Sequence, residues 1–204
     1  MTPGIFITFE GIEACGKSTQ AEALARGLGE RVVLTREPGG TALGRKVREI
    51  LLESSITPIP EVEALLFLAD RTQHLHEVVR PALAKGRIVI SDRYQDSSLA
   101  YQSMGRGVGD LVPEVFARIR GLRPDLTILI DIDVDIALER LRGRGAANRL
   151  DGEAPAFHGR VRQAFLDLAR AEPDRFEVLS GAQSVADLSE EIRFRVEARF
   201  RGRL

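Results

Sequence analysis

The chain alternates short apolar runs with longer segments in which apolar residues recur every three to four positions. Five short runs predict β-strands, at residues 5–9, 32–35, 87–91, 126–131 and 176–179. These runs are almost continuously apolar, which is typical of strands covered on both faces. The periodic segments predict helices at residues 17–28, 42–52, 61–79, 113–121, 135–142, 155–171 and 184–200.

The order of these elements predicts the fold class. Strand followed by helix, repeated along the chain, favours a five-stranded parallel sheet with helices on both faces, a three-layer α/β arrangement. A length of 204 residues suits a single domain spanning residues 1–204, with room for a small lid. The most polar and loosest stretch, residues 143–153, is predicted to be a mobile loop.

Composition narrows the class of protein. The formal net charge of -1 gives no sign of binding to nucleic acid or to a membrane surface. No apolar run approaches the ~18 residues that a membrane helix needs, and the N-terminus shows no secretory signal. We therefore expect a cytoplasmic protein. Only three of its 29 basic residues are lysines, so a lysine in a demanding position stands out.

One of those lysines lies in a phosphate-binding motif. Residues 11–18, GIEACGKS, match G-x-x-x-x-G-K-[ST] at the junction of a predicted strand and a predicted helix. The loop's backbone amides and the helix N-terminus are expected to hold phosphate oxygens, with Lys17 on the β- and γ-phosphates and Ser18 on Mg²⁺. The predicted nucleotide-binding residues are Gly11, Ile12, Glu13, Ala14, Cys15, Gly16, Lys17, Ser18 and Thr19.

The rest of the sequence indicates which kind of phosphate-binding protein this is. A guanine-nucleotide switch is excluded, because the single asparagine, Asn148, is not followed by the lysine of an N-K-x-D motif. A kinase of small molecules needs a second anion site, and Asp92 and Arg93 follow the third predicted strand. Arginines also crowd around the loose loop at Arg140, Arg142, Arg144 and Arg149; for Arg140 we expect a solvated helix face.

Several segments taken together resemble bacterial thymidylate kinases. They are FEG at 9–11, TREPGGT at 35–41, LFLADR at 66–71, DRY at 92–94, SSLAYQ at 97–102, NRLD at 148–151 and FHGRVR at 157–162. TREPGGT together with F-x-A-D-R is specific, since adenylate and guanylate kinases lack both. The resemblance covers residues of about 4–179. It implies a P-loop nucleoside monophosphate kinase fold, a homodimer, and Mg²⁺-dependent transfer of the γ-phosphoryl group of ATP to dTMP, giving dTDP and ADP for dTTP biosynthesis.

The resemblance also implies roles at the acceptor base. Phe67 would stack on thymine, Arg71 would hydrogen-bond its O4 edge, and Tyr101 would crowd the sugar 2′ position. Gln102 is a further base-site candidate. Ser98 takes a place where family members often carry the longer Asn or Thr. On periodicity alone, Phe67 would be interpreted as a core residue, so its functional role depends on the resemblance.

A second set of implied roles concerns phosphate and metal. Arg93 and Arg48 would hold the dTMP phosphate, since an arginine fork matches phosphate geometry. Glu37, beside Arg36, would lie near Mg²⁺-bound water or the acceptor phosphate. Asp92 would join Ser18 at the metal.

No general base is expected, because a phosphate monoester with a second pKa of about 6 is already largely a dianion at neutral pH. The chemistry then depends on positioning and charge stabilisation. The family carries a catalytic arginine either in the cradle or in the lid. Residues 12–15 of the cradle include no basic residue, so the implied subgroup has it in a lid of about residues 142–153. Arg149 is the first candidate and Arg144 the second, with Arg144 also expected to bind ATP. The predicted catalytic residues are Lys17, Arg93, Arg149 and Glu37.

Two alternatives stay open at this point. Another nucleoside or nucleotide monophosphate kinase would share the cradle and differ in its acceptor. A non-catalytic ATP-binding regulatory module would bind ATP without acceptor-dependent ADP formation, and it would have no need for the arginines of the second anion site.

Overall fold

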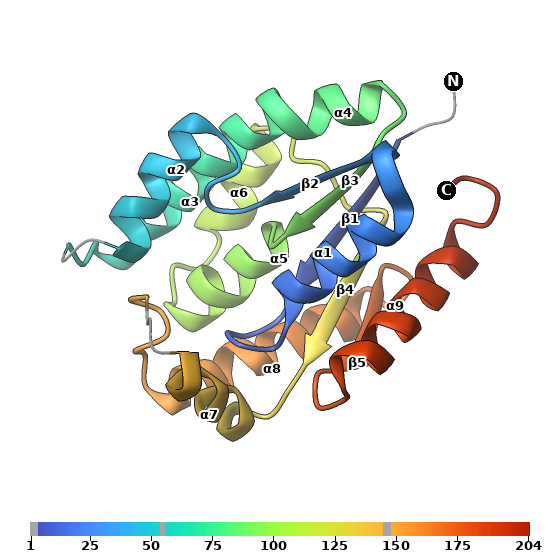
Figure 1. The fold of residues 1–204 in the computed structure, drawn as a ribbon. Coiled ribbons are helices and arrows are strands. Elements are labelled where there is room, and N and C mark those ends of the chain that lie inside the picture. Colours follow the sequence, from blue (N-terminus) through green and yellow to red (C-terminus); the bar gives the residue numbers. More distant parts are fainter. Residues whose placement is uncertain (1–3, 54–55, 145–147) are drawn as a thin grey trace.

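The computed structural model describes residues 4–53, 56–144 and 148–204. Its centre is a parallel sheet whose strands lie in the order β2-β3-β1-β4-β5 (Figure 1). The strands are β1 (Ile5–Glu10), β2 (Val32–Arg36), β3 (Ile88–Asp92), β4 (Leu126–Asp131) and β5 (Phe176–Ser180). The five predicted strands are thus confirmed to within one residue at each end.

Helices connect successive strands, and one further helix follows β5. They are α1 (Lys17–Leu28), α2 (Ala42–Arg48), α3 (Pro60–His74), α4 (Arg80–Ala84), α5 (Gln95–Ser98), α6 (Leu111–Arg118), α7 (Val134–Arg144), α8 (Pro155–Ala171) and α9 (Val185–Arg199). Within the described part of the chain, no helix has the length and apolar character needed to cross a membrane.

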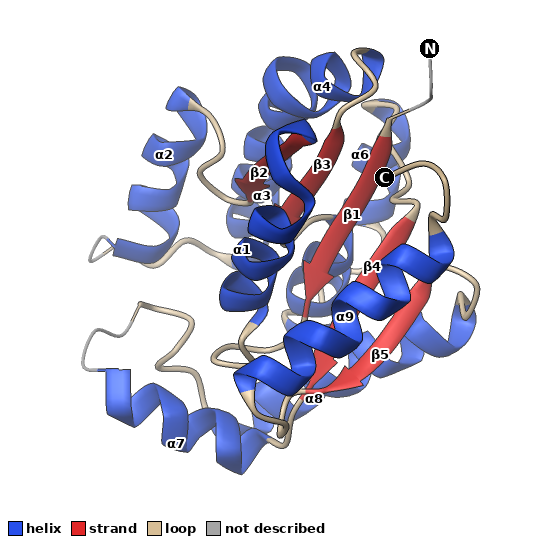
Figure 2. Ribbon diagram, turned by 45° about the vertical axis from the view of Figure 1, so that its right-hand side comes forward, coloured by secondary structure: helices blue, strands red, loops and turns tan. Residues whose placement is uncertain are grey.

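The helices form two layers around the sheet. Helices α1 and α9 cover one face, while α4, α6 and α8 lie on the other, and α2 packs on α3 beside the β2 edge (Figure 2). The central strand β1 is buried along its whole length, as its sequence IFITFE requires. Phe9, Ile90 and Ile128, on three neighbouring strands, are fully buried in the core.

The structure differs from the sequence prediction in three helical regions. The predicted helix 42–52 is α2 followed by a π-helical turn over Glu49–Glu53. The predicted helix 61–79 is α3 followed by a second π-helical turn over Leu75–Val79, and the helical path continues through α4 to Ala84. Helix α5 and the π-helical segment η4 (Leu99–Gly105) were not predicted.

Candidate active site

The phosphate-binding loop joins β1 to α1, as predicted. Gly16, the residue before α1, has a left-handed φ of 100°. A side chain at Gly11 would meet the Ile130 carbonyl oxygen at 2.5 Å, so only glycine fits where the loop passes β4. The Nζ of Lys17 donates to the Ile12 carbonyl at 3.0 Å, which folds the lysine back over the loop.

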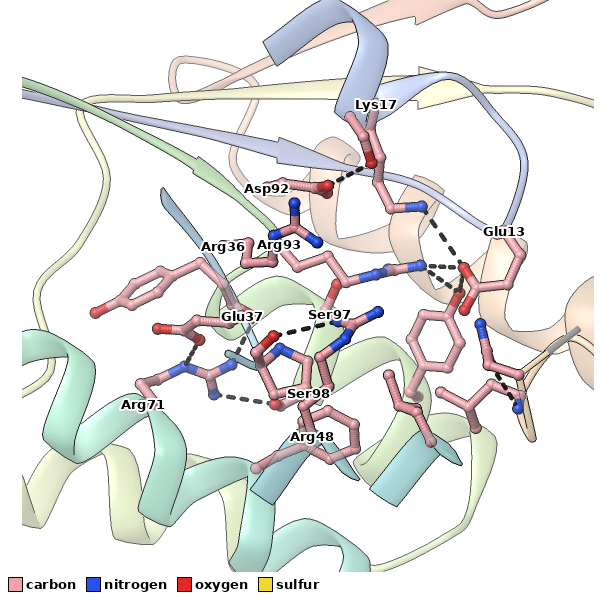
Figure 3. Close-up of a pocket in the computed structure, with 18 of the residues that line it drawn as sticks. Glu13, Lys17, Arg36, Glu37, Arg48, Arg71, Asp92, Arg93, Ser97 and Ser98 are labelled. Carbon is pink, nitrogen blue, oxygen red and sulfur yellow. Dashed lines mark hydrogen bonds and ion pairs between the residues drawn. The ribbon is translucent and has the colours of Figure 1, made fainter. Parts of the chain in front are cut away.

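Arg93 faces this loop from the end of β3. Its φ of 72° is left-handed, an uncommon conformation for an arginine, and its Nη1 donates to the Gly11 carbonyl at 3.0 Å and to Ser97 Oγ at 2.9 Å. Its Nη2 pairs with Glu13 and donates to the Tyr101 hydroxyl at 3.2 Å (Figure 3). Arg93, predicted to form part of a second anion site, therefore lies against the cradle.

The Glu13 carboxylate pairs with the cationic groups of both Lys17 and Arg93. Lys17 Nζ lies 3.6 Å from its carboxylate, and the Tyr101 hydroxyl donates to it at 3.0 Å. Burial by itself would raise the pKa of Glu13, but Arg93 and Lys17 bring that pKa below its ordinary value. The carboxylate is consequently ionised and holds both cations at one end of the cavity.

Asp92 and Ser18, the two predicted metal ligands, are in contact with each other. The Ser18 hydroxyl donates to Asp92 Oδ2, while Asp92 Oδ1 is buried and has no hydrogen-bond partner among the described residues. An unpaired carboxylate oxygen beside a hydroxyl suits Mg²⁺, which prefers a few oxygen ligands and keeps several waters. Within the described residues, no group of three or more His, Cys, Asp or Glu side chains could hold a metal by itself.

Glu37 follows β2 and is fixed from two sides. Arg71 Nε donates to its Oε2 at 2.8 Å, and His74 Nδ1 lies 2.7 Å from its Oε1. The Thr35 hydroxyl contacts the other nitrogen of that imidazole at 2.7 Å. Glu37 is 4% exposed and lines the cavity, so β2 and α3 together hold a carboxylate facing the cavity.

Arg71 is buried rather than exposed, and it connects α3 with the α5 region. Its Nη1 donates to Ser98 Oγ at 2.9 Å and its Nη2 to the Tyr94 carbonyl at 2.8 Å. Each of these nitrogens carries a second N–H, which leaves donor capacity on the guanidinium. Arg71, Ser98 and Phe67 all line the same cavity.

That cavity has a volume of about 170 Å³ and opens to solvent. It brings together most of the predicted site residues: Glu13, Ala14, Lys17, Ser18, Arg36, Glu37, Arg48, Phe67, Arg71, Asp92, Arg93, Ser98, Tyr101 and Gln102. Arg48, on α2, reaches toward the chain after β2, where its Nη1 donates to the Pro38 carbonyl at 3.2 Å. Phosphate-binding and base-binding candidates therefore share one space.

The two lid arginines are placed differently from the other candidates. Arg149 pairs with Glu63 on α3 and donates from Nε to the Leu51 carbonyl at 3.0 Å. It is not among the described residues that line the cavity. The side chain of Arg144, the last residue of α7, lies outside the described part of the structure.

Sequence reasoning missed several residues that support the site. Arg140, expected on a solvated helix face, instead donates to the Ala14 carbonyl at 3.4 Å and to the Gly181 carbonyl at 2.9 Å. That expectation is wrong, because the guanidinium crosses from α7 to the cradle. Glu63 and His74 were also missed, since a lone charged residue inside an amphipathic helix carries no signal of its partners.

This sheet order, with a phosphate cradle after β1 and an arginine facing it from β3, defines a P-loop kinase of the nucleoside monophosphate kinase class. The family model described as thymidylate kinase matches residues 9–192. The chain belongs to the thymidylate kinase family.

Individual relatives agree with this assignment. The chain is 49% identical to the thymidylate kinase of Carboxydothermus hydrogenoformans, with 93% of this chain and 95% of the relative covered. It is 48% identical to that of Deinococcus radiodurans, with 94% and 96% covered. The crystal structure of thymidylate kinase from Ehrlichia chaffeensis is 35% identical and superposes with a TM-score of 0.79, covering 96% of this chain and 100% of that one.

Proposed function

We propose that this protein transfers the γ-phosphoryl group of ATP to dTMP, giving ADP and dTDP for dTTP biosynthesis. The observation that carries the proposal is the position of Arg93, which faces Lys17 and Glu13 of the cradle in the cavity that Phe67 and Arg71 also line. A cradle for one polyanion and a cation for a second, side by side, is the arrangement that phosphoryl transfer between nucleotides requires.

In this proposal, a phosphate oxygen of dTMP attacks the γ-phosphorus, and the bond from that phosphorus to the β–γ bridging oxygen breaks. The acceptor is already a dianion at neutral pH, so no base has to remove a proton. Lys17 and Arg93 offset the negative charge as the two phosphates approach. Ser18 and Asp92 would hold Mg²⁺, which when bound neutralises phosphate charge.

The acceptor would lie toward α3 and α5. Phe67 offers an aromatic ring to the thymine, Arg71 offers donors to its O4 edge, and Tyr101 restricts the sugar 2′ position, with Ser98 and Gln102 beside the base. Arg48, Arg36 and Glu37 line the same cavity and would contact or orient the dTMP phosphate. Of the lid residues, Arg149 and then Arg144 are the candidates for covering the transferred phosphoryl group.

The proposal extends to the assembly and its location. Helices α2 and α3 expose apolar side chains, with Leu43 at 49%, Val62 at 43% and Leu65 at 48% of their surface. We propose that this face packs against a second copy of the chain to form a homodimer, and that the enzyme works in the cytoplasm.

The deciding experiment measures ADP formation by the purified protein with ATP and Mg²⁺, offering dTMP, dUMP, dCMP, AMP and GMP in turn. We expect strong turnover with dTMP, weak turnover with dUMP and none with the others. Turnover with a different acceptor would contradict the thymine assignment and keep the kinase. ATP binding without acceptor-dependent turnover would make the protein a regulatory module.

A further inference from the structure

Glu63 is a buried carboxylate that takes no part in the proposed phosphoryl transfer. It lies on α3 with 1% of its surface exposed, one helical turn before Phe67. Its Oε1 accepts from Gln102 Nε2 at 3.0 Å and from Arg106 Nε at 3.3 Å, and its Oε2 pairs with Arg149. Burial alone would raise the pKa of Glu63, yet the hydrogen bonds from Gln102 and Arg149 and the nearby Arg106 bring it below its ordinary value.

Both arginines connect Glu63 to the segment 148–153, which follows α7. Arg149 belongs to that segment, and its backbone nitrogen donates to the Leu52 carbonyl at 3.3 Å. Arg106, at the end of η4, also pairs through Nη2 with Glu153. Both ends of the segment are therefore linked to Glu63 on α3, one directly through Arg149 and the other from Glu153 through Arg106.

The tied segment forms part of the cavity wall. Leu150 and Asp151 line the cavity, and Leu150 is 6% exposed. Gln102, the third partner of Glu63, lines the cavity as well. The same carboxylate thus fixes a side chain at the base site and the segment that covers the site.

We propose that Glu63 is a positioning residue that anchors the segment 148–153 over the acceptor half of the cavity, acting through Arg149 and Arg106. The inference builds on the proposed dTMP kinase activity and adds the residue that holds the lid in place. An arginine held by a buried carboxylate and a carbonyl serves as an anchor, and it would have to leave Glu63 to contact a phosphate. The inference therefore gives Arg149 an anchoring role in place of the phosphoryl-covering role, which passes to Arg144.

An anchoring role and a catalytic role of Arg149 predict different kinetic effects of its substitution. If Arg149 is an anchor, Glu63→Gln and Arg149→Gln disturb the same contact and have similar effects. Each raises the KM for dTMP about tenfold while kcat stays within about threefold, because the cover over the acceptor is loosened. The double variant is no worse than Glu63→Gln alone, because Glu63→Gln already removes the contact through which Arg149 acts.

Hydrogen exchange adds a measurement that does not depend on catalysis. The amides of residues 149–151 should exchange about tenfold faster in Glu63→Gln than in the wild type, because the local opening free energy falls. Glu61→Gln, an exposed carboxylate two positions earlier on α3, is the matched control and should leave exchange and KM unchanged. If Glu63→Gln does not fold, Arg106→Gln, which removes a half-buried partner, is expected to speed exchange in the same segment.

Three results would overturn the inference. The first is a double variant whose effect on KM is the product of the two single effects, and the second is unchanged exchange at residues 149–151 in folded Glu63→Gln. The third is a lower kcat in Arg149→Gln at wild-type KM, while Glu63→Gln keeps wild-type kinetics. The last result would place Arg149 at the transferred phosphoryl group. A wild type without dTMP kinase activity would contradict the proposed function instead, while the exchange experiment would still test the anchor.

Discussion

At the scale of single residues, the site depends on a few charges whose neighbours are fixed by the fold. Lys17 is one of three lysines in a chain with 29 basic residues. Its ammonium lies against the Ile12 carbonyl and 3.6 Å from Glu13, in the turn where a phosphate would be held by backbone amides. The scarcity of lysine made this position visible in the sequence, while its carboxylate partner became apparent only in the structure.

Lys17→Ala is expected to lower kcat for dTMP phosphorylation by about 100-fold or more, because it removes a preorganised charge from the transition state. Lys46→Ala is the matched control, since Lys46 is exposed on α2 and pairs with Glu49 just after that helix. Steady-state kinetics with ATP and dTMP measure both. A Lys17→Ala enzyme with unchanged kcat would contradict the role of this lysine.

Glu10, at the end of β1, is a residue whose charge state should affect stability. Burial, with a contribution from Asp96, raises the pKa of Glu10 from 4.5 to about 8. Its two oxygens accept from the Tyr94 amide at 2.8 Å and from the Ser97 hydroxyl. Because its folded-state pKa is above the unfolded value, its contribution to stability is complete below about pH 4.5 and is lost as the pH rises through 8.

Glu10→Gln resembles the protonated side chain and should not lose this contribution. We expect the free energy of unfolding of the variant, relative to wild type, to increase between pH 5 and pH 9 by more than about 1.4 kcal/mol, the equivalent of one pKa unit. Urea unfolding at the two pH values measures the difference. Glu114→Gln, at an exposed position on α6, should show no such dependence. A pH-independent difference for Glu10→Gln would mean that Glu10 is ionised throughout.

At the scale of elements, apolar patterning predicted the strands, whereas helical segments held in place by polar contacts were missed. The strands were found because each is a buried apolar run between helices. Helix α5 and segment η4 were missed because the face they bury is partly polar. Ser97 contacts Arg93, Ser98 contacts Arg71 and Gln102 contacts Glu63. Hydrophobic periodicity cannot detect a helix that is held in place by buried hydrogen bonds.

The candidate site shows the same limit. The cradle motif located Lys17 and Ser18, and the family resemblance located Phe67 and Arg71, which the cavity brings together. Pairings between distant segments, such as Arg140 with the Gly181 carbonyl, depend on how α7 lies across the sheet. Such contacts follow from the assembled fold and have no local pattern in the sequence.

The N-cap of helix α2 lies at the opposite end of the helix from Arg48, the residue of α2 that lines the cavity. The Thr41 side chain accepts from the Gly44 amide at 2.9 Å, and Arg48 lies at the other end of the helix. Thr41→Ala should lower the free energy of unfolding by about 1 kcal/mol, the usual effect of losing such a cap. It should also raise the KM for dTMP, because Arg48 is then less well positioned.

Ser184→Ala is the control for this prediction. Ser184 caps α9 by accepting from the Asp187 amide at 3.1 Å, on a helix that carries none of the proposed dTMP contacts. We expect a similar loss of stability, measured by thermal or urea unfolding, without a change in KM for dTMP. Equal KM changes in both variants would show that lower stability alone, and not the position of Arg48, accounts for the effect.

At the scale of the whole molecule, apolar side chains are exposed on several elements, and two of these places bear on how copies of the chain could pair. One is the face of α2 and α3, which exposes Leu43, Val62 and Leu65. The other is on α9, which exposes Phe194 at 68% of its surface; this helix packs on β5 at the opposite edge of the sheet (Figure 1). The first place is formed by helices that also carry cavity residues, Arg48 on α2 and Phe67 on α3. Pairing of two copies through α2 and α3 would therefore brace the acceptor site from outside.

Val62→Glu combined with Leu65→Glu should separate the proposed dimer, because an isologous contact brings the same new charges together from both copies. Light scattering after size exclusion should give twice the chain mass of 22.5 kDa for the wild type and a single chain mass for the variant. Phe194→Glu is the control and should leave the dimer intact. Helices α2 and α3, which lose their contact with the second copy in the monomer, carry Arg48 and Phe67. The KM for dTMP should therefore rise in the monomer, while the KM for ATP changes less. A wild type that is monomeric at assay concentrations, or a variant that dissociates with an unchanged KM for dTMP, would show that the acceptor site is complete within one chain.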